Sequence, residues 1–162
     1  METYKMTIAG LERELPIFKL NDELSIAAFI MFGDAEITVA SARELLKKVP
    51  DFDYILTPEA KSIPLAHEMS RQSGKKYFVA RKGEKVYMGN SFSVEVKSIT
   101  TKKVQKLYLG ELDVEEMKGK NVLIVDDVIS TGESLIAVKK LAEEAGANIV
   151  ASCAVLAEGD AA

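Results

Sequence analysis

The sequence lacks several features that would place it in a common class of proteins. It has a single cysteine, Cys153, which excludes an intrachain disulfide framework and a cysteine-rich metal site. Because Cys153 stands in an apolar run, we interpret it as a buried thiol. No apolar stretch approaches the roughly 20 residues that a helix needs to span a bilayer, and the N-terminus has no hydrophobic signal segment. We therefore expect a cytoplasmic protein without a membrane partner.

The chain also lacks an excess of positive charge. Its 21 Lys and Arg residues face 25 Asp and Glu residues, a net charge of −4, so we do not expect a nucleic acid partner. Basic residues do gather in segments 75–85 and 97–106. No repeat, low-complexity tract or Pro/Gly linker divides the 162 residues, of which 48% are hydrophobic. This composition indicates one domain with a substantial core.

Apolar runs alternate along the chain with segments of helical periodicity. The predicted strands cover residues 52–57, 76–80, 121–125 and 148–156. The predicted helices cover residues 38–48, 62–73 and 133–145. Near-continuous apolar strands separated by helices favour an α/β fold with a central parallel sheet and helices on both faces.

Polar residues follow three of these predicted strands, in segments 57–62, 81–83 and 126–134. Because the carboxyl ends of parallel strands meet at one edge of the sheet, we expect the three segments to form one ligand-binding rim. Between Arg81 and Gly119, apolar and polar residues alternate, which predicts a hairpin with its tip near residues 88–90. We expect residues 83–106 to be a flexible loop that acts as a lid, and residues 1–34 to form a small hood over the rim.

The most informative segment is 122–134. An apolar strand leads into Asp126 and Asp127, and a small Ser130-Thr131-Gly132 turn then precedes a helix. The two acids can accept hydrogen bonds from neighbouring sugar hydroxyls, and the turn can present backbone N–H groups to a phosphate. An alternative is a capping box, in which Ser130 and Glu133 satisfy the same N–H groups. The acid pair directly before the turn favours the phosphate site.

This segment resembles the phosphoribosyl pyrophosphate (PRPP) motif of type I phosphoribosyltransferases. From about residue 11 onward the chain is similar to that family, above all to its adenine phosphoribosyltransferase branch. The resemblance implies a type I phosphoribosyltransferase fold and transfer of a 5-phosphoribosyl group from PRPP to a purine base, with adenine favoured, in purine salvage. It also implies Mg²⁺ as cofactor and a homodimer. Family members usually continue for another strand beyond the segment that corresponds to 148–156.

The resemblance further implies roles for individual residues around the sugar. Asp126 and Asp127 would hold the ribose hydroxyls and act as catalytic residues, with Mg²⁺ carried by PRPP close to them. The 5-phosphate would be bound by Ser130, Thr131, Gly132, Glu133 and Ser134. The pyrophosphate would be bound by Glu59, Ala60, Lys61, Ser62, Arg81, Lys82 and Lys85.

Two further assignments concern the base. Glu95, in the stretch Phe92-Ser93-Val94-Glu95, would be the general acid/base near the purine. Ile17, Phe18 and Lys19 resemble a segment that cradles the base in the adenine branch, with Phe18 stacking on the purine.

Two other functions remain open at this point. A regulator of the same fold would sense PRPP or a nucleotide without catalysis, and would need a basic patch for its nucleic acid. A phospho-accepting receiver domain also has an apolar strand that ends in an acid pair, but there the pair falls near the start of the chain.

Overall fold

The computed structural model describes residues 1–97 and 104–159. The strands are β1 (Thr3–Ile8), β2 (Leu11–Lys19), β3 (Ser25–Ala27), β4 (Tyr54–Pro58), β5 (Tyr77–Ala80), β6 (Phe92–Lys97), β7 (Val104–Leu109), β8 (Asn121–Ile129) and β9 (Asn148–Ala157). The helices are α1 (Ala35–Leu46), α2 (Ile63–Ser73), α3 (Glu111–Met117), α4 (Glu133–Glu144) and the short 3₁₀ helix η1 (Val86–Met88). In the described part of the chain, no helix has the length and apolar character that a membrane crossing requires.

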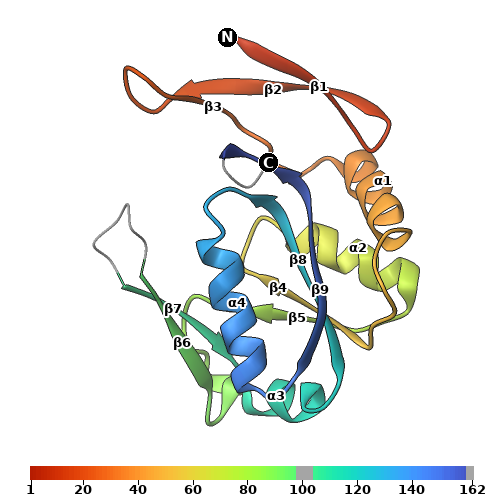
Figure 1. Ribbon diagram of the computed structural model, residues 1–162, viewed down its shortest axis with the longest axis vertical. Coiled ribbons are helices and arrows are strands. Elements are labelled where there is room, and N and C mark those ends of the chain that lie inside the picture. Colours follow the sequence, from red (N-terminus) through yellow and green to blue (C-terminus); the bar gives the residue numbers. More distant parts are fainter. Residues whose placement is uncertain (98–103, 160–162) are drawn as a thin grey trace.

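The centre of the molecule is a parallel sheet in the order β5–β4–β8–β9, which confirms the predicted α/β architecture (Figure 1). Successive residues of β8 point to opposite faces, and both faces are buried. Val122 and Ile124 pack in one cluster with residues of α4, whereas Leu123 and Val125 pack in another with residues of α1 and α2. Burial on both faces explains why the strand reads as a continuous apolar run.

The helices begin and end at residues suited to those positions. Helix α1 begins after Asp34, whose carboxylate accepts a hydrogen bond of 3.1 Å from the Ile37 N–H group. Helix α2 has Pro64 in its first turn and ends at Gly74, which has a left-handed φ of 74°. The predicted helices and strands of the central layer are therefore confirmed, with ends that differ by a few residues.

The segment that follows β5 forms the predicted hairpin, but in a different register. β6 and β7 are antiparallel, and Lys97 pairs with Val104, so the connection falls at residues 98–103, outside the described residues. The predicted tip at residues 88–90 is wrong, because residues 86–88 form the helix η1 before β6. The hairpin contacts the end of β5 through two backbone hydrogen bonds between Tyr108 and Arg81, the residue that follows β5. The flexibility of residues 83–106 stays a prediction.

Strands β1, β2 and β3 form a separate antiparallel sheet, which we call the hood sheet. It lies above the carboxyl ends of β8 and β9 (Figure 1). Ile8 and Leu15 on this sheet are buried in the same apolar cluster as Ile37 of α1. The structure thus places an N-terminal layer over the rim, as the sequence predicts.

Candidate active site

The rim brings together the polar segments that follow β4 and β5 with the acid pair of β8. Lys61, after β4, places its Nζ atom 3.7 Å from Oδ2 of Asp127 on β8. Glu59, also after β4, accepts a hydrogen bond of 2.7 Å from Arg81 Nε at the end of β5. Three segments far apart in the sequence therefore meet at one edge of the sheet, as the strand pattern predicts.

Asp126 and Asp127 are both almost fully buried, with 8% and 4% of their surfaces exposed. The Asp127 N–H group donates a 2.8 Å hydrogen bond to Oδ1 of Asp126. Oδ2 of Asp127 has no hydrogen-bond partner among the described residues. Burial raises the pKa of Asp126 to about 7, and the neighbouring Asp127 carboxyl adds to the rise. Such a buried acid pair is suited to hydroxyl donors or to a nearby cation.

A chain of buried hydroxyl groups holds the acid pair in place. Thr57 Oγ1 donates a 2.8 Å hydrogen bond to the carbonyl of Val125, directly before Asp126. Ser62 Oγ lies 2.7 Å from Thr57 Oγ1 and 3.1 Å from the Pro58 carbonyl. These hydrogen bonds connect the end of β4 to β8. Thr57 was not among the predicted site residues, although a threonine at the end of a buried strand is a signal for such a role.

The turn after β8 has the geometry of an anion-binding helix start. Gly132 is the N-cap residue of α4, with a left-handed φ of 81°, and has no side chain with which to cap the helix. The capping-box alternative, with Ser130 at the cap, is therefore wrong. Thr131 Oγ1 lies 3.4 Å from the Glu133 nitrogen, a long contact. Ser130, Thr131, Gly132 and Ser134 border a small hollow of about 40 Å³ that reaches Asp126.

The predicted pyrophosphate residues are brought together around Glu59. This carboxylate accepts hydrogen bonds from the Lys82 N–H group, at 3.1 Å, and from Arg81, and these contacts lower its pKa. Arg81 also donates to the Tyr87 hydroxyl, a partner that the sequence did not indicate. Glu59 thus orients Arg81 and Lys82, and the positive charge that a pyrophosphate group needs would come from those two residues. Lys85 is exposed, and its charge also favours the ionised form of Glu59.

The remaining pyrophosphate candidates lie on the connection from β4 to α2. Ala60 is exposed, and the peptide bond that joins it to Glu59 is cis. Ser62 is buried and precedes the first turn of α2. The Ser62 side chain is engaged in the hydrogen bonds with Thr57 and the Pro58 carbonyl.

Glu95 lies on β6, where its side chain is 59% exposed and 3.9 Å from Lys106 Nζ on β7. With Lys82 and Tyr108 it borders a hollow of about 590 Å³. The structure therefore brings Glu95 near the basic pair but not to the cavity beside the Ser130 turn. Its catalytic role stays a prediction.

A large cavity, of about 840 Å³, lies between the hood sheet and the turn at residues 130–132. Residues 24–27 and Phe29 line it from one side, and residues 156–159 close another. Ile17, Phe18 and Lys19, the predicted base residues, lie at the end of β2 and do not line it. The neighbouring strand β3 lies there instead, a result of the β2–β3 pairing that the sequence pattern does not reveal.

Within residues 1–97 and 104–159, no group of three or more His, Cys, Asp and Glu side chains could hold a metal ion. A dedicated protein cage is therefore absent from this part of the chain. The acid pair, in which Oδ2 of Asp127 has the Lys61 ammonium group nearby but no hydrogen-bond partner among the described residues, fits a cation that is bound mainly by ligand oxygens.

Comparison with known proteins places the chain in a family. A family model described as "Phosphoribosyl transferase domain" matches residues 32–162. A hypoxanthine/guanine phosphoribosyltransferase of Methanothrix thermoacetophila is 33% identical over 151 residues, which cover 90% of this chain and 76% of that protein. The chain therefore belongs to the phosphoribosyl transferase domain family, and the resemblance noted in the sequence is confirmed.

A second relative, the hypoxanthine/guanine phosphoribosyltransferase of Methanococcus voltae, is 41% identical over 110 residues, which cover 68% of this chain. The chain spans just over half the length of that relative, 55%. Among solved structures, one match is adenine phosphoribosyltransferase from Saccharomyces cerevisiae, in a complex with adenine and an imino-altritol bisphosphate. Its TM-score is 0.74 and its sequence identity is 21%, over 89% of this chain and 84% of that one. The enzyme from Thermoanaerobacter pseudethanolicus matches with a TM-score of 0.72 and 19% identity, over 89% and 95%. These structures confirm the type I phosphoribosyltransferase fold.

Proposed function

We propose that the chain transfers the 5-phosphoribosyl group of PRPP to a ring nitrogen of a purine base. The bond from the sugar C1 atom to pyrophosphate breaks, a bond from C1 to the base nitrogen forms, and the base loses a proton. The observation that carries the proposal is the buried pair Asp126–Asp127 on β8, followed closely by the start of α4 at Gly132, an N-cap residue without a side chain. That order matches the order of groups on the sugar phosphate, with hydroxyls beside the acids and the phosphate at the turn.

The residues at the rim have separate parts in this reaction. Asp126 and Asp127 would accept hydrogen bonds from the ribose hydroxyls and stabilise positive charge that develops on the sugar. Lys61, Arg81 and Lys82 would offset the negative charge of the leaving pyrophosphate. Mg²⁺, bound to PRPP oxygens close to the acid pair, would supply further positive charge there. The cavity under the hood sheet would hold the base and exclude water.

Glu95 belongs to this proposal as the general acid/base for the purine. Its carboxylate is exposed on the β6–β7 hairpin and borders the same hollow as Lys82. It would reach the base if the hairpin approached the rim, which is the lid movement expected of this segment. A homodimer is proposed on the ground of the family resemblance, and a cytoplasmic location is proposed as the sequence leads us to expect.

The identity of the base is a narrower question. The resemblance in the sequence favours adenine, and both solved structures described above are adenine enzymes. The relatives with 33% and 41% identity are named for hypoxanthine and guanine. A purine with either an amino or an oxo group at position 6 is therefore the proposed class of acceptor.

The test is pyrophosphate release from PRPP and Mg²⁺ with adenine, hypoxanthine, guanine, xanthine and uracil in separate reactions. We expect release with at least one purine and none with uracil. Release with adenine but not hypoxanthine would support the adenine assignment, and the reverse would overturn it. Calorimetric binding of PRPP without release in any reaction would contradict the transferase and favour a regulator that senses PRPP.

A further inference from the structure

The hood sheet contacts the rest of the protein through side chains. In the described residues, no backbone hydrogen bond connects β1, β2 or β3 to the parallel sheet or to its helices. Apolar contacts do connect them, because Ile8 and Leu15 lie in the cluster that contains Ile37 and Leu65. The hydrophobic effect is not directional, so these contacts restrict the angle of the hood sheet less than hydrogen bonds would.

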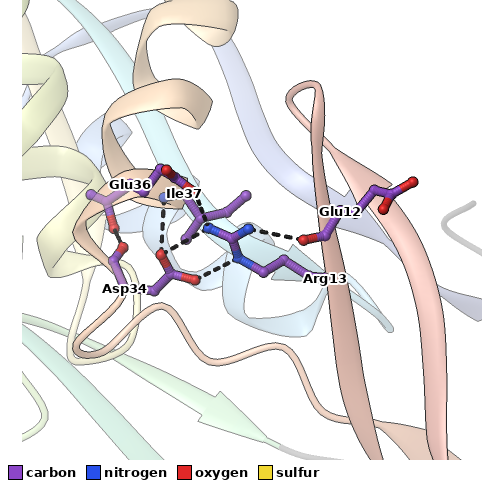
Figure 2. Close-up of polar contacts among 6 residues, drawn as sticks. Glu12, Arg13, Asp34, Glu36 and Ile37 are labelled. Atoms are coloured by element: carbon purple, nitrogen blue, oxygen red, sulfur yellow. Dashed lines mark hydrogen bonds and ion pairs between the residues drawn. The ribbon is translucent and has the colours of Figure 1, made fainter.

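One arginine supplies the directional contact. Arg13, on β2, donates from Nε to Oδ2 of Asp34 at 2.8 Å and from Nη2 to Oδ1 at 3.1 Å. Nη2 also donates to Oε1 of Glu36 at 2.9 Å, and Nη1 donates to the Glu12 carbonyl at 2.9 Å. Figure 2 shows the guanidinium group of Arg13 between the β1–β2 hairpin and the start of α1, with these contacts drawn as dashed lines. Within the described residues, Arg13 makes the polar side-chain contacts from the hood sheet to the rest of the protein.

The acceptor is itself tied to a helix. Oδ1 of Asp34 also accepts the hydrogen bond from Ile37 N–H that begins α1. Helix α1 packs against α2, whose start follows the Glu59–Ser62 connection at the rim. The planar guanidinium in a two-point contact with Asp34 restricts orientation more than a single-point contact would. Arg13 therefore connects the hood sheet to the same helical layer that carries part of the rim.

The position of the hood sheet determines the width of the large cavity. Tyr4, Met6 and Leu15 of the hood sheet line this cavity from one side, and the turn at residues 130–132 lines it from the other. Leu15 lies two residues from Arg13 on the same strand. A change in the angle of β2 would therefore change the distance between the two walls.

We propose that Arg13 is a positioning residue, whose contact with Asp34 and Glu36 holds the hood sheet at the angle that closes the cavity over the base. The part of this inference that concerns the base rests on the proposed transferase function. Arg13 touches no reacting group in this account and acts through the hood sheet.

The test compares Arg13→Gln with the wild type in two measurements. Steady-state kinetics should show KM for the base raised by about tenfold, with KM for PRPP changed less than about twofold, because the sugar site lies on the other wall. Hydrogen–deuterium exchange should become faster in β1, β2 and β3 but not in β8. Arg13→Lys should recover part of the loss, because it keeps the charge but not the two-point contact.

Two further variants separate the contact from its surroundings. Asp34→Asn keeps a residue able to cap α1 but removes the carboxylate, so it should reproduce the effect of Arg13→Gln. Glu14→Gln is the control. It breaks the 3.4 Å ion pair between Lys5 and Glu14 on the β1–β2 hairpin, whose two side chains, Lys5 and Glu14, are 82% and 57% exposed. Because such an exposed pair contributes little, the variant should leave both measurements unchanged.

The outcomes distinguish this inference from the proposed function. Unchanged exchange in β1–β3 in Arg13→Gln would overturn the inference, as would faster exchange with an unchanged KM for the base. A wild-type protein that transfers to no base would overturn the proposed function. Exchange in Arg13→Gln and Asp34→Asn would then decide by itself whether the contact holds the hood sheet.

Discussion

Asp126 shows how strongly the surroundings of one residue determine its chemistry. Its carboxyl group is buried beside Asp127, and burial raises its pKa from the ordinary value of 3.8 to about 7. Because the folded pKa exceeds the unfolded one, the group favours folding most below about pH 4, and this contribution is lost as the pH rises through about 7. The site therefore gives up some stability to keep a carboxylate where the ribose would bind.

This shift predicts a pH dependence of ligand binding. PRPP should bind more tightly as the pH rises from about 6 to about 8, because ionised Asp126 is the better acceptor for a hydroxyl group. Calorimetric titration at several pH values measures the trend. Asp126→Asn removes the titrating group and controls for ionisation of the ligand phosphates. An equal slope in wild type and variant would show that Asp126 is not the group responsible.

At the scale of elements, the central sheet was predictable because strands that are buried on both faces appear in the sequence as continuous apolar runs. The apolar first part of β8, up to Asp126, and the helix after Gly132 follow directly from such apolar runs. Helix α3 was missed because it has seven residues, of which only Val114 and Met117 are buried. Too few apolar positions fall on its inner face to show a helical period.

The start of α4 carries a prediction at this scale. Gly132→Val should weaken PRPP binding by about tenfold or more, because a branched side chain at a left-handed position displaces the backbone that would bind phosphate. Gly74→Val is the matched control, since Gly74 has a similar φ of 74° and open space around it, at the end of α2. Both variants should lose roughly 1–2 kcal/mol of unfolding free energy in denaturant titrations.

The two glycine variants separate strain from binding. If both weakened PRPP binding to the same extent, the loss would reflect general destabilisation, and the turn at Gly132 would not be the phosphate site. If neither did, the assignment of the turn would also be wrong.

At the scale of the whole molecule, the parts that the sequence did not reveal are those made by contacts between distant segments. The chemistry of the acid pair and the turn was readable because both lie within 13 consecutive residues. The large cavity was not, because it depends on how β3 pairs with β2 and on where the hood sheet rests over residues 130–132. The contact of Arg13 with Asp34 joins residues 21 positions apart, and no local pattern marks it.

The central claim is that the acid pair on β8 and the turn after it form a PRPP site. The most direct measurement is calorimetric titration of PRPP with Mg²⁺ into the wild type and into a variant with both Asp126→Asn and Asp127→Asn. Asp51→Asn, an exposed acid, serves as the control for loss of charge. We predict binding to the wild type and to Asp51→Asn, and affinity lower by about tenfold or more in the double variant, since two charge-assisted hydrogen bonds are lost. Equal affinity in all three proteins would contradict the account.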